Sequence, residues 1–336
     1  LRAPKVLIAT GTRPAMPAIP GIESIDYLTS TTALDLKDLP KSLIVVGGGF
    51  VGVELAQVFA RAGVKVTIAC RSRLLPAAEP ELSEALAKYF VQEGITVVGG
   101  IAYECCQKTD AGVELSVRKG DRLEVLAAEK ILVATGRRPN VEQLGLAEAG
   151  IRQSQSGAIV VDDRMRTSRK GTYAAGDVTG RDQFVYMAAY GAKLAAMNAL
   201  NSDSLVYDNS TMPEVVFTDP QVASVGLTEA AAKAAGHVVA TSVLSLDNVP
   251  RALAARDTRG LIKLVADAKT RKLIGAHILA PEGADSIQTA AMAIKFGMTV
   301  EQLGEMIFPY LTTVEGLKLA AQTFNKDVKM LSCCAG

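Results

Sequence analysis

A run of glycines between a predicted strand and a predicted helix constrains this chain more than any other feature. Residues 47–52 (GGGFVG) match the pattern G-x-G-x-x-G and follow the apolar run 42–46. In this context Gly47 permits a tight turn, Gly49 lets the backbone approach a pyrophosphate, and Gly52 lets helix and strand pack closely. The helix N-terminus then offers N–H groups to phosphates. We expect a Rossmann-like, doubly wound α/β domain that binds a dinucleotide; the alternative is a plain glycine-rich turn.

The end of the next predicted strand indicates which dinucleotide binds. An NAD site typically has Asp or Glu about 20 residues further on, where it holds the ribose 2′-hydroxyl. Here Cys70 takes that place and is followed by Arg71 and Arg73. Because arginine can pair bidentately with a 2′-phosphate, we expect NADPH. The alternative is that both arginines are solvated surface charges. Glu54, just after the glycine turn, is a further cofactor-binding candidate.

Composition excludes several other classes of protein. A chain of 336 residues is too long for one ordinary core, so we expect two or three domains. Its 36 Lys and Arg nearly balance its 35 Asp and Glu, which argues against a nucleic-acid partner. No apolar run reaches the ~18–20 residues of a membrane span. Four of the five cysteines form two adjacent pairs, unlike a secreted disulfide framework, so we expect a cytoplasmic protein.

The chain starts at Leu1 and enters a predicted buried strand at 5–11, so we expect lost sequence upstream.

Three further motifs accompany the glycine turn. They are 7–14 (LIATGTRP), 134–140 (ATGRRPN) and 173–177 (YAAGD). With the glycine turn, this set resembles the flavoprotein disulfide reductases, which bind FAD and a nicotinamide nucleotide. The resemblance implies that Gly136 lies at the cofactor and that Asp177 bonds the ribityl chain of FAD. A carboxylate that follows a glycine at a strand end can accept such a hydroxyl without steric cost.

The same resemblance implies a domain organisation. Residues 1–13 would end the first FAD-domain segment, and 14–137 would form the NADPH-binding domain. Residues 138–210 would be the returning second FAD-domain segment. Residues 211–336 would form an α+β dimerisation domain that makes the protein a homodimer.

A motif near the C-terminus departs from that family. Residues 308–315 (FPYLTTVE) lie where the disulfide reductases carry His-Pro-Thr-x-x-Glu, whose histidine is the acid–base for thiol chemistry. Aligning the glutamate on Glu315 places Tyr310 at the histidine position. The two histidines, His237 and His277, lie elsewhere and are expected to be ordinary surface or strand residues. The missing base argues against glutathione or lipoamide as substrate.

A pair of adjacent cysteines, Cys333 and Cys334, comes just before the last two residues of the sequence. Adjacent cysteines persist as dithiols, because their disulfide closes a strained ring, and a dithiol suits a soft metal ion. The alternative is a chance pair on a frayed terminus. Together with Tyr310 and the disulfide-reductase motifs, the pair makes the chain resemble the mercuric reductases. Residues 217–220, 247–252 and 315–330 extend this resemblance through the whole chain. That resemblance implies that electrons pass from NADPH through FAD to Hg(II). The ion would be received by Cys333 and Cys334 at the partner subunit's site, with Tyr310 and Glu315 as site residues.

Two parts that this resemblance implies are absent from the 336 residues. They are a first glycine motif for the ADP part of FAD and a redox Cys-x4-Cys pair. As written, the chain is therefore expected to be inactive alone. Two other readings remain: a disulfide reductase of unusual substrate, and a truncated module that binds nucleotide and sequesters metal by its thiols. Cys105 and Cys106, after a predicted strand, are either incidental thiols or a second metal site.

Overall fold

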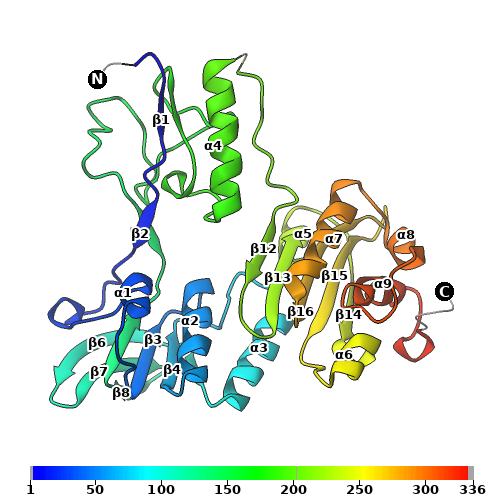
Figure 1. Cartoon of the computed structure of the whole chain (residues 1–336), viewed down its shortest axis with the longest axis horizontal. Helices are drawn as coiled ribbons and strands as arrows, with labels where there is room; N and C mark the ends of the chain where they lie inside the picture. Colours follow the sequence, from blue (N-terminus) through cyan, green and yellow to red (C-terminus); the bar gives the residue numbers. More distant parts are fainter. Residues whose placement is uncertain (1–2, 202, 332–336) are drawn as a thin grey trace. The chain divides into compact units, whose positions relative to one another are not determined.

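The computed structural model describes residues 3–201 and 203–331 (Figure 1). The chain divides into two compact units, one formed by 1–17 with 135–209 and the other by 18–134 with 210–336. Both mix strands and helices, which confirms the expected α/β class. In the part of the chain described, no helix combines the length and apolar character needed to cross a membrane.

The first unit is built from strands that are far apart in the sequence. Val6 pairs with Thr172 in a parallel ladder, while Arg13 pairs with Arg138 in an antiparallel one. One long helix completes the unit. Its elements are β1 (Val6–Ile8), β2 (Thr12–Pro14), β10 (Arg137–Pro139), β11 (Thr172–Ala174), η2 (Asp177–Thr179) and α4 (Val185–Leu200).

The second unit begins with a parallel sheet of order β5-β4-β3-β9 and an antiparallel sheet of order β6-β7-β8. Pro80 opens one of its helices at a position where a missing N–H does no harm. The elements of this segment are η1 (Ile22–Ser24), α1 (Ser30–Leu34), β3 (Ser42–Val46), α2 (Phe50–Arg61), β4 (Lys65–Cys70), α3 (Pro80–Gln92), β5 (Thr96–Gly99), β6 (Ala102–Thr109), β7 (Gly112–Lys119), β8 (Arg122–Ala128) and β9 (Lys130–Val133).

Alternation along β3 explains how the parallel sheet is covered. Leu43 and Val45 join an apolar cluster with α2 and α3, whereas Ile44 and Val46 join one with β7. Successive side chains of a strand point to opposite faces, so a continuous apolar run is buried on both. Helices thus cover one face of this sheet and the β6-β7-β8 sheet covers the other.

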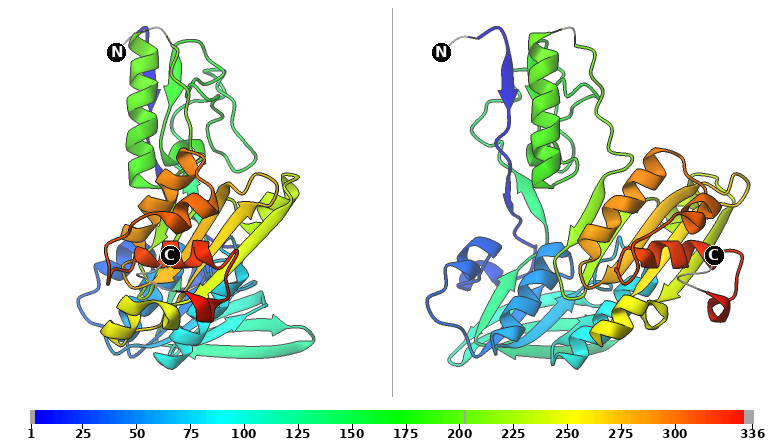
Figure 2. Two further views of the ribbon diagram at one scale, coloured as in Figure 1. Left: turned by 90° about the vertical axis from the view of Figure 1, so that its right-hand side faces the viewer. Right: turned by 45° about the vertical axis from the view of Figure 1, so that its right-hand side comes forward.

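The second unit ends with a five-stranded antiparallel sheet of order β12-β13-β16-β15-β14. Helices α7, α8 and α9 gather over one face of it (Figure 2). The elements are β12 (Pro213–Val216), β13 (Gln221–Gly226), α5 (Glu229–Ala234), β14 (Val239–Ser245), η3 (Leu246–Asn248), α6 (Pro250–Ala255), β15 (Leu261–Asp267), β16 (Leu273–Ala280), α7 (Gly283–Lys295), α8 (Val300–Glu305), α9 (Glu315–Gln322) and η4 (Val328–Met330).

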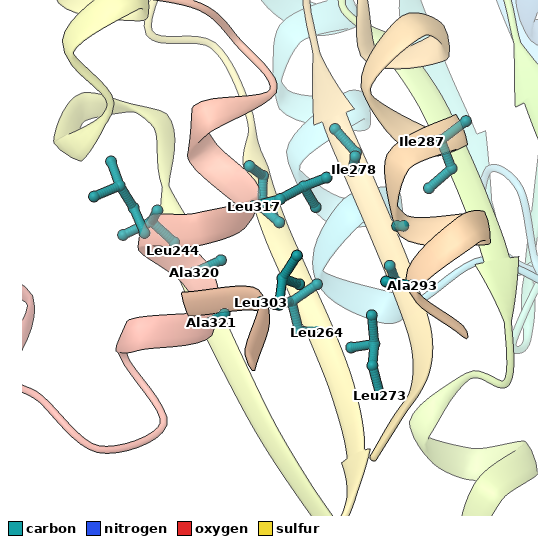
Figure 3. Close-up of a cluster of buried hydrophobic side chains, with 14 of the residues drawn as sticks. Leu244, Leu264, Leu273, Ile278, Ile287, Ala293, Leu303, Leu317, Ala320 and Ala321 are labelled. Atoms are coloured by element: carbon teal, nitrogen blue, oxygen red, sulfur yellow. The ribbon is translucent and has the colours of Figure 1, made fainter. Parts of the chain in front are cut away.

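The core between this sheet and its helices is almost entirely aliphatic (Figure 3). Leu264 and Ile278 from the strands meet Ile287, Leu303 and Leu317 from the helices, and all five are buried. Small alanine side chains from strands and helices fill many of the other positions in this cluster.

Two sequence expectations need correction. No strand was expected at 102–109, yet β6 lies there and carries Cys105 and Cys106, because its polar side chains mask the strand pattern. The strand predicted to be buried at 5–11 is partly exposed, with Val6 and Leu7 open to solvent. In the described residues β1 pairs only with β11, so one of its edges has no neighbour.

Two neighbouring residues of α3 test this account of the core. Phe90 is fully buried, whereas Val91 is 60% exposed. Phe90→Ala should lower the free energy of unfolding by about 3–5 kcal/mol through lost apolar contact and a cavity. Val91→Ala should change it by no more than about 0.5 kcal/mol. Urea unfolding of both variants measures the difference, and equal effects would contradict the packing described.

Candidate functional site

The glycine turn joins β3 to α2 as the sequence predicts. Gly47 donates its N–H to the Ala69 carbonyl at 2.9 Å, and Gly49 is the N-cap of α2. A Cβ on Gly52 would lie 2.3 Å from the Gly47 carbonyl oxygen, so only glycine lets helix and turn approach this closely. A Cβ on Gly49 would meet no described atom within 4 Å. Gly49 therefore borders open space at a helix N-terminus, where a phosphate group fits.

Arg71 and Arg73 follow β4 but differ in their contacts. Arg73 donates to the carbonyls of Pro76 and Ala78 at 3.0 and 2.7 Å. Arg71 is exposed and, among the described residues, forms no hydrogen bond or ion pair. Cys70 takes the place of the acidic residue of a typical NAD site. Burial raises the pKa of its thiol, so Cys70 carries no charge at neutral pH. Arg73 thus holds its own loop, whereas Arg71 is available to a ligand.

Glu54 lies on α2 and is committed to a backbone contact. Its Oε1 accepts the N–H of Phe217, just beyond β12, at 2.7 Å. Burial raises the pKa of the Glu54 carboxyl, and this hydrogen bond partly offsets the rise. Glu54 therefore ties the dinucleotide segment to the second sheet, and a role toward a cofactor remains a prediction.

In the first unit, Asp177 is the first residue of η2, three residues after the end of β11. Its Oδ2 accepts a hydrogen bond from Thr12 Oγ1 at 2.9 Å, and Arg137 Nε donates to the same hydroxyl oxygen at 2.7 Å. Within the described residues, Asp177 Oδ1 accepts no hydrogen bond. Gly136, between β9 and β10, borders open space in the same way as Gly49. In the Asp177 carboxylate, Oδ2 is therefore held by Thr12, whereas Oδ1 has no partner among the described residues.

Thr12 and Arg137 were missed as partners of Asp177. A signal for them exists, because residues 9–14 (ATGTRP) and 134–139 (ATGRRP) nearly repeat each other. The two copies run antiparallel as β2 and β10. Reading them as a pair would have placed both side chains beside the strand that leads to Asp177.

Tyr310 and Glu315 lie in very different surroundings. Tyr310 is 60% exposed in the turn between α8 and α9, whereas Glu315, the first residue of α9, is 1% exposed. No hydrogen bond joins the two side chains in the described part of the chain. Glu315 Oε2 is buried and has no hydrogen-bond partner there. A cavity of about 420 Å³ borders this turn, with Leu311 and Asp285 in its lining.

The cysteines divide into those that the structure places and those that it does not. Cys333 and Cys334 lie outside the described residues. Cys105 and Cys106 are free thiols on β6, and burial raises the pKa of Cys106 to about 11, which keeps it protonated and a poor ligand. Over residues 3–201 and 203–331, no group of three His, Cys, Asp or Glu side chains could hold a metal ion.

Known families match most of the chain. Residues 1–196 match the pyridine nucleotide-disulphide oxidoreductase family, and residues 212–321 match the dimerisation domain of pyridine nucleotide-disulphide oxidoreductases. The first match covers 1–17, the whole of 18–134, and 135–196 of the second half of the first unit.

Several curated proteins are similar over the full length of the chain. It is 48% identical to a mercuric reductase of Lysinibacillus sphaericus over all of this chain and 62% of that protein. It is 50% identical to one of Shigella flexneri over 99% of this chain and 59% of that protein. It is 47% identical to one of Streptomyces lividans over all of this chain and 71% of that protein. The chain thus spans about three fifths of the length of most curated relatives that it matches.

Solved structures share the fold. The Cu(II) complex of the HOCl-induced flavoprotein disulfide reductase RclA from Escherichia coli superimposes with a TM-score of 0.87 at 31% identity. That match covers 96% of this chain and 73% of the other. LpdA from Mycobacterium tuberculosis gives a TM-score of 0.84 at 28% identity, over 96% of this chain and 70% of its own.

Two glycines of the turn provide a matched pair of variants. Gly52→Ala should destabilise the protein by about 1–3 kcal/mol, because its Cβ collides with backbone. Gly49→Ala should leave the free energy of unfolding within about 0.5 kcal/mol, because its Cβ enters open space. It should nevertheless weaken dinucleotide binding, because that space is where the pyrophosphate would lie. Thermal unfolding and calorimetric titration with NADP+ measure the two effects. Undiminished binding by Gly49→Ala would contradict the assignment of the turn.

Proposed function

This chain belongs to the pyridine nucleotide-disulphide oxidoreductase family, and on that premise we propose that it serves as a mercuric reductase. The reaction is NADPH + Hg(II) → NADP+ + H+ + Hg(0). Two electrons leave the nicotinamide and reduce the metal ion. One observation carries the proposal: mercuric reductases resemble this chain across its whole length, including the region of Tyr310 and Glu315.

The geometry of the glycine turn supports NADPH as the electron donor. The open space at Gly49 accepts a pyrophosphate at the N-terminus of α2, and the unpaired guanidinium of Arg71 lies one residue beyond β4. Arginine binds a phosphate bidentately, whereas a ribose hydroxyl offers it no negative charge. On this proposal the turn binds the cofactor and Arg71 recognises the 2′-phosphate.

The chemistry of Asp177 fits the ribityl chain of FAD. Its Oδ2 accepts a hydrogen bond from Thr12, which leaves Oδ1 to accept a hydrogen bond from a ribityl hydroxyl. When bound, FAD supplies two-electron transfer between the nicotinamide and a thiolate-held metal ion. Thr12 and Arg137 would orient the Asp177 carboxylate for that contact.

The C-terminal region supports a homodimer that captures Hg(II). Cys333 and Cys334 supply two soft thiolate ligands, the donor type that a soft metal ion prefers. Tyr310 is exposed, and its hydroxyl can donate a hydrogen bond to a group on a second subunit. The buried Oε2 of Glu315, which has no partner among the described residues, can accept a hydrogen bond. Large apolar side chains are exposed on the same domain, as a dimer contact requires: Phe217, Met292, Phe296, Met306 and Ile307.

Oxidation of NADPH, followed by absorbance in the presence of excess small thiol, tests the proposed reaction on a purified protein that joins these residues to a bound flavin and a redox Cys-x4-Cys pair. Hg(II) should stimulate the oxidation, and glutathione disulfide should not. Stimulation by glutathione disulfide alone would favour the disulfide reductase instead. Hg(II) binding without NADPH consumption would favour a module that only sequesters metal.

The two adjacent cysteine pairs form a matched test of Hg(II) capture. The double variant Cys333→Ser with Cys334→Ser should lose Hg(II)-dependent oxidation when competing thiol is low, and should keep its affinity for NADPH. Cys105→Ser with Cys106→Ala should keep both, because β6 carries no role in the proposal. Equal turnover of the two double variants would remove the terminal pair from the mechanism.

The two arginines should respond differently to substitution. Arg71→Gln should weaken binding of 2′,5′-ADP by about 10- to 100-fold, the effect of one charge-assisted contact, and should leave 5′-AMP unaffected. Arg73→Gln should also weaken binding of 2′,5′-ADP, but by less, because it frees the carbonyls of Pro76 and Ala78 and loosens the loop that presents Arg71. Calorimetric titration gives both affinities. An unchanged preference for 2′,5′-ADP in Arg71→Gln would show that Arg71 is a solvated surface charge.

A further inference from the structure

The loop that carries the two arginines is fixed to the glycine turn. The N–H of Leu75 donates to the Gly48 carbonyl at 2.7 Å, and Leu75 has a φ of +45°, in the left-handed region that side chains disfavour. Ser83 Oγ, in the first turn of α3, donates to the Leu74 carbonyl. Leu74 and Leu75 are both buried. A residue in a strained backbone conformation persists only where surrounding contacts hold it. The conformation of this loop therefore depends on the residues that hydrogen-bond to it.

The loop ends at Glu79, the N-cap residue of α3. The Glu79 carboxylate accepts hydrogen bonds from residues of β15 and α5. Glu79 is 2% exposed. Its Oε2 accepts a hydrogen bond from Lys263 Nζ at 2.9 Å, and its Oε1 accepts the N–H of Glu229 at 2.5 Å. Both oxygens are therefore bound by groups that lie more than a hundred residues along the chain.

Lys263 reaches Glu79 because of its place on β15. Its neighbours Ile262 and Leu264 face the core under α7, α8 and α9, so the Lys263 side chain emerges on the opposite face, toward α3. Lys263 is 1% exposed and also donates to Glu81 at 2.7 Å and to Glu229 at 2.9 Å. Burial alone would lower the pKa of Lys263, but these three carboxylates outweigh burial and raise it.

His277 completes the surroundings of this ion pair without adding charge. It is the register partner of Lys263 on β16, and its Nε2 lies 3.1 Å from the Leu227 carbonyl and 3.8 Å from Glu79 Oε1. Burial lowers the pKa of His277, so the imidazole is neutral and donates to the carbonyl. Lys263 is thus the cation that compensates the buried Glu79 carboxylate.

We infer that Lys263 is a positioning residue for the nucleotide site, because its ion pair with Glu79 holds the loop that presents Arg71 to the 2′-phosphate of NADPH. The inference rests on the proposed function and extends it to a residue of the dimerisation domain. Without Lys263, Glu79 would keep a buried charge that lacks its cation, and the N-terminus of α3 would have to move toward water. The loop that is anchored there would move with it.

The competing explanation is that Lys263 has a structural role alone and joins the two segments of the second unit, 18–134 and 210–336. Arg259 provides the control, because it bridges the same two parts at the other end of α3. It pairs with Asp219 at 3.1 Å and with Glu93, the C-cap of α3, at 3.4 Å. The 13 residues of α3 separate the two bridges by roughly 20 Å. Arg259→Met therefore removes a bridge but leaves the loop untouched.

Calorimetric titration of the whole protein with 2′,5′-ADP and 5′-AMP separates the two explanations. The measured quantity is the ratio of the two affinities, which reports how well the loop presents its arginine. Lys263→Met should lower this ratio about tenfold, whereas Arg259→Met should change it by less than about twofold. If Lys263→Met does not fold, Glu79→Gln, which keeps the volume of the side chain and removes its charge, should lower the ratio in the same direction.

Three results would overturn the inference. A folded Lys263→Met or Glu79→Gln variant that keeps the wild-type ratio would leave Lys263 with a structural role alone. An equal loss of affinity for both ligands would indicate general loosening of the nucleotide site. A wild-type protein with no preference for 2′,5′-ADP would overturn both this inference and the assignment of NADPH, so the two failures are distinguishable.

Discussion

Helix α3 packs its apolar side chains against two sheets. This contact joins two segments of the second unit that are distant in the sequence. Leu86 and Phe90 lie in one apolar cluster with β3 and β4 of the parallel sheet and with Val216, Val222 and Leu279 of the second sheet. Apolar burial of this kind is the main favourable contribution to folding, so the two sheets stabilise each other through the helix that they share. The charged contacts at the two ends of α3 fix its direction rather than supply most of its stability.

The same two-sided burial explains why the second sheet carries polar residues inside. On β15 and β16 one face is aliphatic and lies under three helices, while the other holds Lys263 and His277 against α3. A sheet with solvent on one face could place these residues in water. Here they are enclosed, and every charge among them needs a partner within the protein. The group of Lys263, Glu79, Glu81 and Glu229 meets that requirement within hydrogen-bonding distance.

Local patterns were sufficient to predict much of this structure, and non-local contacts account for what they missed. The glycine turn at 47–52 and the helix that follows it depend on a few adjacent residues, and the structure has both where the sequence places them. From the local sequence, Lys263 would be interpreted as a surface residue of a strand. Its carboxylate partners come from the N-cap and first turn of α3 and from α5, which are remote in the sequence, so no local pattern indicates its burial. The unequal roles of Arg71 and Arg73 depend on the path of the loop to Ala78, which the pattern of charges does not reveal. The predicted site residues Tyr310 and Glu315 were identified through a family motif, and their contrast in burial follows from the start of α9 between them.

The insertion of residues 18–134 into the first unit has a kinetic consequence. The chain leaves that unit through β2 and returns through β10, whose residues pair directly, and the Ala15 N–H bonds the Gly136 carbonyl at 2.9 Å. The β1-β11 and β2-β10 ladders of this unit therefore join residues that are separated by the whole insertion. Contacts of such high sequence separation form slowly, because the intervening chain must first lose its conformational freedom. The inserted segment has its own parallel sheet and can become compact earlier, which brings the two ends together. We therefore expect Asp177, Thr12 and Arg137 to meet late in folding, when β2 and β10 pair, so that the carboxylate proposed to bind the flavin is oriented late as well.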